Sequence, residues 1–291
     1  TLTLADGSTN TLTSGLIDDK KTGISCAGLW VNQGAALIIE GDTGALTAVG
    51  GGTGSHSFDN KGKASGIGAS CVYGSAYDKK YNNVGDITIN GGQVTATGSA
   101  ATNYGGAGIG GGDNASSITI NGGTVLAQAG HLNGTGAAGI GSVYGHKGNK
   151  TITINGGTVT ATGGSAGIGG GAYKNAGTIV INNGTVTATS TGNGAGIGGG
   201  GGQYAGDDMG IGGSITINRG TVTAQGGKYG AGIGGGGADV QAGNKSGAQA
   251  SGDITITDGA VKATGGKYAP GIGSGALGKI ATVDSKGNSV I

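Results

Sequence analysis

The side chains that offer binding chemistry are tyrosines and lysines beside glycine-rich segments. All nine tyrosines lie outside the alternating Ile, Val and Thr runs. A tyrosine ring can stack on a sugar ring while its hydroxyl hydrogen-bonds sugar hydroxyls, and a neighbouring lysine can meet acidic sugars. The alternative is that each ring covers the end of its own loop. The candidate ligand-binding residues are Tyr104, Tyr144, Tyr173, Tyr204, Tyr229, Tyr268, Lys174, Lys228 and Lys267.

Aspartates in glycine-rich loops form a second candidate site. Asp113 precedes Asn114, and Asp207 and Asp208 lie within residues 198–213. Oxygen ligands on a backbone that is free to curl suit Ca²⁺. The sequence contains no EF-hand or nonapeptide calcium pattern, so ordinary polar loop residues are the alternative. Calcium is the one cofactor that the sequence leaves open.

Groups for acid–base catalysis are scarce. The chain has a single glutamate, Glu40, and a single arginine, Arg219, and neither belongs to a repeated constellation. Its histidines, His56, His131 and His146, lie in variable loops without metal-ligand spacing. Cleavage of polysaccharides requires clustered carboxylates, or a metal with a base. We therefore expect no enzymatic activity.

A repeating unit positions all of these residues. Its clearest copy, TITINGGTVTATGGSAGIGGG, spans Thr151–Gly171. Two alternating β-branched runs flank an Asn-Gly-Gly turn, and a glycine-rich segment with one large apolar residue, Ile168, follows. The residue that ends the first run recurs six times, at intervals of 31, 34, 27, 36 and 39 residues. These positions are Asn90, Asn121, Asn155, Asn182, Asn218 and Thr257.

Such repeats predict an all-β parallel β-helix. One strand pair cannot bury its apolar face, whereas stacked coils join Ile, Val and Ala into a continuous column. Three short strands per coil and roughly eight coils, about 4.8 Å apart, give a rod near 40 Å long. The glycine-rich segment predicts a third face where backbones approach closely. A polyproline-II-like glycine helix is the alternative for that face.

Two sets of polar positions stack from coil to coil. The asparagines that end the first run would form an amide ladder at one corner. The outward positions of the second run form a grid, about 6.6 Å by 4.8 Å, that could order water or bind ice. It has eighteen sites between Gln93 and Thr264, of which twelve are Thr. Threonine is also simply a favourable exposed strand residue.

The amino-acid composition limits the classes of partner that the chain can bind. Glycine makes up 76 of 291 residues, a content typical of low-complexity chains, but its fixed positions argue against disorder. A net charge of +1 with 11% charged residues provides no basic field for nucleic acid or an anionic membrane. No apolar stretch approaches the roughly 18 residues of a membrane span. Cys26 and Cys71 could form a disulfide if adjacent coils bring them together, or remain separate thiols.

The repeats resemble a known kind of domain. Leu4–Gly15, Ala27-Gly28-Leu29 and the ITINGGTVTATGG…AGIGGG units are similar to carbohydrate-binding β-helix domains of Gram-positive bacterial secreted and surface proteins. The resemblance implies a right-handed helix, extracellular display and binding of polysaccharides such as pectin or cellulose, in some members with calcium. The scarcity of carboxylates here differs from the acidic, calcium-binding members.

We therefore expect one β-helix domain over residues 1–291. It is treated as a segment of a longer protein, because no signal peptide is visible and the chain starts with Thr1 inside a strand-like run. Residues 1–85 would form divergent N-terminal coils, 86–278 six regular repeats, and 279–291 a terminal strand or the start of another coil. The expected function is extracellular, non-catalytic polysaccharide binding or adhesion, beside neighbouring domains of a surface protein. The alternatives are a structural stalk or spacer and, third, an ice-binding threonine face.

Overall fold

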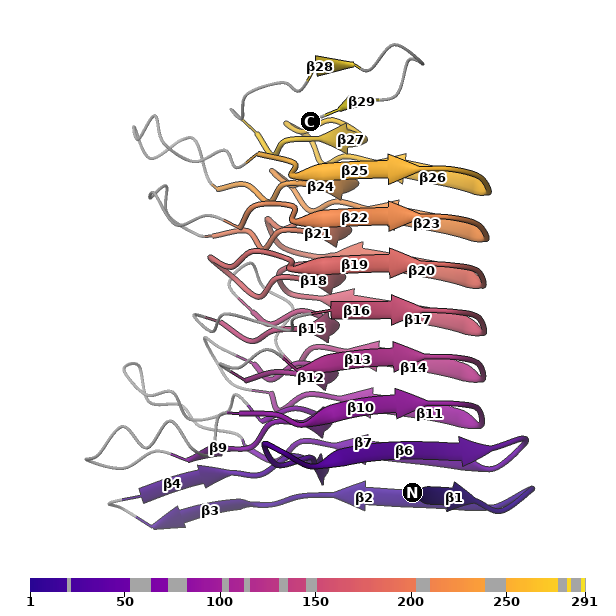
Figure 1. The fold of residues 1–291 in the computed structure, drawn as a ribbon. Coiled ribbons are helices and arrows are strands. Elements are labelled where there is room, and N and C mark those ends of the chain that lie inside the picture. The colour runs from indigo at the N-terminus through magenta and orange to yellow at the C-terminus, as the bar shows by residue number, and fades with distance from the viewer. Residues whose placement is uncertain are drawn as a thin grey trace.

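A computed structural model describes residues 1–19, 22–52, 64–72, 83–100, 105–112, 116–130, 136–144, 151–202, 210–238, 250–276, 282–283 and 289–290. Within these ranges the regular elements are all strands, and no helix is long and apolar enough to cross a membrane. The chain forms a right-handed parallel β-helix with eight coils and three strands per coil (Figure 1). The repeats predicted the coils and strands, and the family resemblance implied the right-handedness.

Three parallel sheets, each of eight strands, form the walls of the rod. The first sheet contains β1 (Leu2–Leu4), β6 (Ala36–Gly41), β10 (Asp86–Ile89), β13 (Ser117–Ile120), β16 (Thr151–Ile154), β19 (Thr178–Ile181), β22 (Ser214–Ile217) and β25 (Asp253–Ile256). The second contains β2 (Thr9–Thr13), β7 (Ala45–Val49), β11 (Gln93–Thr97), β14 (Thr124–Gln128), β17 (Thr158–Gly163), β20 (Thr185–Ser190), β23 (Thr221–Gln225) and β26 (Ala260–Thr264). The third contains β5 (Leu29–Trp30), β8 (Ile67–Gly68), β12 (Ile109–Gly110), β15 (Ile140–Gly141), β18 (Ile168–Gly169), β21 (Ile197–Gly198), β24 (Ile233–Gly234) and β27 (Ile272–Gly273).

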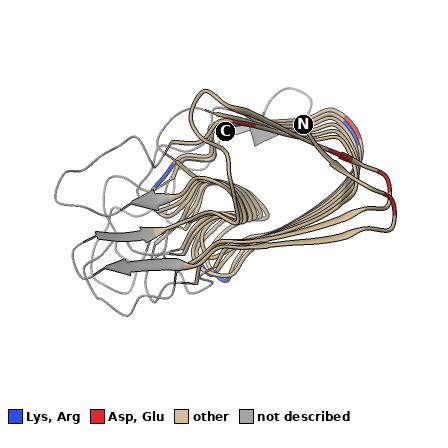
Figure 2. Cartoon of the chain, turned by 90° about the horizontal axis from the view of Figure 1, so that it is seen from below, with Lys and Arg blue, Asp and Glu red and all other residues tan. Residues whose placement is uncertain are grey.

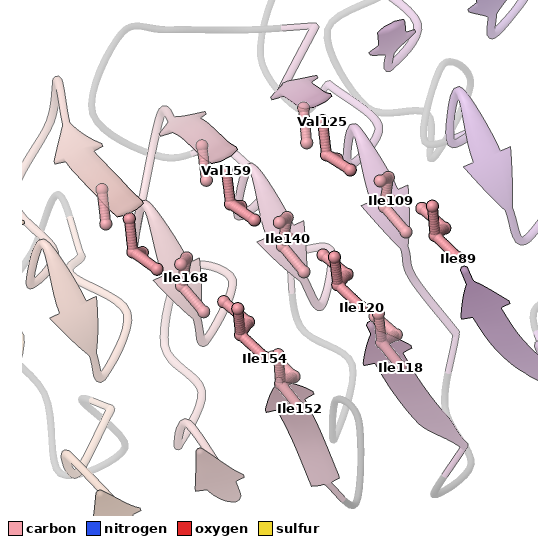
Figure 3. Packing of buried hydrophobic residues seen from close by; sticks show 14 of the residues in the cluster. Ile89, Ile109, Ile118, Ile120, Val125, Ile140, Ile152, Ile154, Val159 and Ile168 are labelled. Atoms are coloured by element: carbon pink, nitrogen blue, oxygen red, sulfur yellow. The ribbon is translucent and has the colours of Figure 1, made fainter. Parts of the chain in front are cut away.

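The core is a column of aliphatic side chains contributed by all three sheets. In one coil, Ile152 and Ile154 come from β16, Val159 and Ala161 from β17, and Ile168 from β18, and all five are buried. Figure 3 shows Ile154, Val159 and Ile168 within the packed interior, with equivalent residues of the neighbouring coils alongside. Because equivalent residues pair in register between coils, each coil extends the same column.

The third sheet depends on close backbone approach, which its glycines permit. A Cβ on Gly167 would lie 2.5 Å from the backbone nitrogen of Thr189. Gly169 has φ +129°, and its Cβ would lie 2.2 Å from the carbonyl oxygen of Gly198. The segment forms two-residue strands in a parallel sheet, with Ile168 opposite Ile197, so the polyproline-II alternative is wrong here.

Irregular pieces accompany the coils at both ends. Near the N-terminus, β3 (Leu16–Asp19), β4 (Thr22–Ser25) and β9 (Cys71–Val72) form an antiparallel sheet that the repeat pattern did not predict. At the C-terminus, β28 (Thr282–Val283) and β29 (Ser289–Val290) also pair antiparallel, rather than as another parallel coil. Cys26 is a free thiol.

Candidate functional site: the Tyr–Lys edge and the polar columns

The candidate tyrosines occupy two different places in the coil. Tyr229 and Tyr268 lie between the second and third sheets, after β23 and β26. Tyr144 and Tyr173 lie after the third sheet, behind β15 and β18. The sequence does not distinguish the two places, because both flank the glycine-rich segment. We call these four tyrosines with Lys174, Lys228 and Lys267 the Tyr–Lys edge.

The first part of this edge is an aromatic stack across two coils. The rings of Tyr229 and Tyr268 have centroids 5.1 Å apart and lie 12° from parallel. The ammonium Nζ of Lys228 lies 4.6 Å from the centroid of Tyr229, and that of Lys267 lies 5.1 Å from the centroid of Tyr268. These are cation–π distances, which also fix the direction of each lysine.

The two stacked rings differ sharply in exposure. Tyr229 is 1% exposed, so its ring is part of the packed structure and not an accessible contact for a ligand. Tyr268 is 40% exposed. Tyr229, a candidate ligand contact, is therefore covered, because the ring of Tyr268 in the next coil lies against it. The signal in the sequence was the identical Gly-Gly-Lys-Tyr spacing after β23 and after β26.

The second part of the edge is an edge-to-face pair. Tyr144 and Tyr173 have ring centroids 5.5 Å apart at 88°, and both side chains are half-buried. Tyr173 has φ +66°, and no other described non-glycine residue has a positive φ. Lys174 is half-buried, and its carbonyl oxygen accepts from the backbone N–H of Gly200. Tyr173 is thus held in a backbone conformation that costs free energy for an L-residue.

The other predicted site residues lie outside the described ranges: Tyr104, Tyr204, Asp113, Asp207 and Asp208. Among the residues that the structure does describe, no three His, Cys, Asp or Glu side chains gather as a metal site would require. Calcium binding by the aspartates stays a prediction.

The single glutamate of the chain, Glu40, and its single arginine, Arg219, lie on the corner between the first and second sheets. Glu40 accepts a hydrogen bond from Asn90 Nδ2 at 3.3 Å. Arg219 and Asp258, on neighbouring coils, approach to 3.6 Å as an exposed ion pair. Figure 2, viewed along the rod, shows how few charged residues the described coils carry. Each of these charged groups is matched with a neighbour on another coil.

The predicted asparagine ladder is confirmed at this corner. The Nδ2 of each ladder asparagine donates to the Oδ1 of the ladder asparagine in the preceding coil, at 2.7 Å. The donor and acceptor pairs are Asn121 to Asn90, Asn155 to Asn121, Asn182 to Asn155 and Asn218 to Asn182. Thr257 Oγ1 donates to Asn218 Oδ1 at 3.5 Å at the C-terminal end. Glu40 at the other end was missed, because it replaces asparagine in the divergent second coil.

The outward threonine grid is also present, and it is larger than predicted. Register pairs Thr160 with Thr187, and Thr187 with Thr223, without a bulge. The grid continues into the first two coils through Thr9, Thr11, Thr13 and Thr47. In β17, β20 and β23, eight of the nine outward sites are Thr, Gln225 being the ninth. This face, named here the threonine face, carries Lys262 as its charged residue.

The comparisons with known proteins identify the repeat but no relative. A family model described as a β-helix repeat matches residues 87–113, 118–145, 152–172, 179–202, 215–237 and 254–276. No curated protein and no solved structure matches the chain. The matched segments coincide with the six regular repeats and together span half of the chain. The chain therefore belongs to the β-helix repeat family.

Proposed function

We propose that this domain is a non-catalytic, extracellular polysaccharide-binding module and that the exposed residues of the Tyr–Lys edge contact the glycan, with Tyr229 as support behind them. The observation that carries the proposal is the ring of Tyr268, 40% exposed, backed by Tyr229 and accompanied by Lys267. An exposed aromatic ring with a polar tip suits the apolar face and hydroxyl rim of a sugar.

Preorganisation supports this assignment. The stack on Tyr229 and the neighbouring ammonium of Lys267 restrict the rotamers of Tyr268 before any ligand arrives. Binding then loses less side-chain entropy than it would on a mobile ring. Lys267 and Lys228 are exposed, so they add cations for carboxylate-bearing sugars. An acidic polysaccharide such as pectin is accordingly favoured over a neutral one.

A structural stalk or spacer is the second candidate. The unbroken register of the three sheets and the amide ladder along one corner favour it, since both stiffen the rod. In this role the domain would hold its neighbours in a larger surface protein at a fixed distance.

The threonine face supplies a third candidate, ice binding. β-branched threonines have few χ1 rotamers, so an in-register array presents its hydroxyls and methyls in a nearly fixed pattern. Thermal hysteresis in the unmodified domain, abolished by Thr160→Lys and Thr187→Lys, would favour this candidate. An absence of hysteresis would remove it.

Retention on insoluble plant polysaccharides and on a soluble glycan array tests the main proposal. Tyr268→Ser and Lys267→Ala should each weaken retention, whereas Leu126→Ser should not. Leu126 is a matched control because it is also 40% exposed but lies on the threonine face. Equal loss in all three variants would indicate unfolding, which circular dichroism would check.

The remaining outcomes separate the alternatives. Retention of the unmodified domain that is lost only with a chelator would assign binding to calcium held by Asp113 and by Asp207-Asp208. Retention that survives both Tyr268→Ser and Lys267→Ala would place the glycan contact elsewhere. No retention on any glycan would reject the polysaccharide proposal and favour the spacer.

A further inference from the structure

The corner turn between the first and second sheets contains one asparagine that the ladder does not hold. Asn182 belongs to the ladder, and Asn183 follows it. Asn183 takes the place that Gly156 occupies one coil earlier and Arg219 one coil later. Its side chain is exposed and makes no hydrogen bond within the described part of the chain. The next residue is Gly184, at φ +104°.

Three ladder asparagines precede glycine as Asn183 does, but their side-chain amides are held by hydrogen bonds. Asn90, Asn121 and Asn155 are each followed by glycine, and each is exposed. Their Nδ2 groups donate to Glu40, Asn90 and Asn121 respectively. Their Oδ1 atoms accept from the following coil. Exposure therefore does not distinguish these residues from Asn183, whereas hydrogen bonding does.

We infer that Asn183 is a site of spontaneous chemical modification, in which the side-chain amide is lost to an aspartate or isoaspartate. The Gly184 nitrogen attacks Cγ of Asn183 and gives up its proton to solvent. The Cγ–Nδ2 bond then breaks, ammonia leaves, and a cyclic imide remains. Water adds to either imide carbonyl and reopens the ring, so the net change is one water in and one ammonia out.

The ladder opposes this reaction at the other dipeptides. Cyclisation turns Cγ toward the next backbone nitrogen and expels Nδ2, so it must break the bonds that Asn121 and Asn155 make to both neighbouring coils. The unbonded carboxamide of Asn183 has no such bonds to break. Glycine at position 184 adds no side chain that would shield the attacking nitrogen.

Modification at this corner would alter the rod in two ways. Either product adds a negative charge beside Arg219, which holds the equivalent corner position in the following coil. Arg219 already pairs with Asp258. The isoaspartate product also inserts a methylene group into the main chain between β19 and β20. That added length works against the register of both strands with their neighbours.

Peptide mapping by mass spectrometry after incubation of the folded domain at mildly alkaline pH tests the inference. Deamidation at Asn183 should be roughly 5- to 30-fold faster than at Asn121 and Asn155, the ratio expected for one or two extra neutral hydrogen bonds. In urea-unfolded chain the rates should converge. Asn183→Gly is the matched control, since it restores the residue found at Gly91, Gly122 and Gly156.

A second variant tests the role of the ladder itself. Asn121→Ala removes the acceptor of Asn155 Nδ2 and should accelerate deamidation at Asn155 in the folded domain, by roughly fivefold for one lost bond. The inference is overturned if folded Asn183 reacts no faster than Asn155. It is equally overturned if unfolding accelerates Asn183 as much as it accelerates the ladder residues.

Discussion

Asn155 Nδ2 donates a 2.7 Å hydrogen bond to Oδ1 of Asn121, so that two residues 34 positions apart in the sequence join neighbouring coils. The same Asn155 accepts an equal bond from Asn182 on the other side. Each internal asparagine thus uses both ends of its amide, and all Nδ2 donors point toward the N-terminal end. Side chains at this corner add cross-coil bonds to those of the backbone.

Asn155→Ala should lower the free energy of unfolding by about 1–2 kcal/mol, because two neutral hydrogen bonds are lost and water replaces them in part. Urea denaturation measures the change. Asn183→Ala is the control, since that side chain is exposed and makes no hydrogen bond within the described residues, and it should alter stability little. Equal effects from the two variants would contradict a stabilising ladder.

The repeated parts of the fold could be predicted because local pattern and global fold agree there. Ile152, Ile154, Val159 and Ile168 alternate with polar residues or glycine, and the same spacing recurs in each coil. Stacking is then the only way to bury them together. The asparagine ladder follows from the same reasoning, because equal positions in successive coils must become neighbours.

The candidate site was less predictable, because it depends on which loop residues meet between coils. Nothing in the composition of its loop distinguishes buried Tyr229 from exposed Tyr268. Tyr229 is covered by Tyr268 of the following coil, whereas Tyr268 belongs to the last coil of the three sheets. Likewise, the antiparallel pairing of β3 with β4 lies outside the repeat and has no period to reveal it.

Ser190 gives a test of polar burial inside the wall. Its Oγ is buried without a hydrogen-bond partner in the described structure, in a position held by Gly163 and Ala129 in the two preceding coils. Ser190→Ala should raise the free energy of unfolding by about 1 kcal/mol, because an unpaired buried hydroxyl is removed.

Ser165 provides the matched opposite. Its Oγ accepts from the buried backbone N–H of Gly201 at 3.0 Å, so Ser165→Ala should destabilise by about 1–3 kcal/mol. Denaturant midpoints of the two variants should shift in opposite directions. A shift of both in the same direction would show that hydroxyl satisfaction does not control stability here.

Gly167 tests the close approach of the third sheet. An alanine Cβ there would lie 2.5 Å from the Thr189 nitrogen and 2.7 Å from the Gly196 oxygen, so backbone must move. Gly167→Ala should cost about 3 kcal/mol or prevent folding. Gly15→Ala, where a Cβ meets nothing within 4 Å, should be neutral or up to about 1 kcal/mol stabilising. Thermal unfolding of both variants provides the comparison.

Tyr173 tests whether its positive φ stores strain. Tyr173→Ala and Tyr173→Gly both lose the ring contact with Tyr144, but only glycine adopts φ +66° without steric cost. The glycine variant should therefore be more stable than the alanine variant by about 1 kcal/mol. At the adjacent Lys174, which has no positive φ, the order should reverse, because glycine there adds only conformational entropy to the unfolded chain. Urea titrations of the four variants decide the matter. If alanine is the more stable at both positions, the backbone at Tyr173 is not strained.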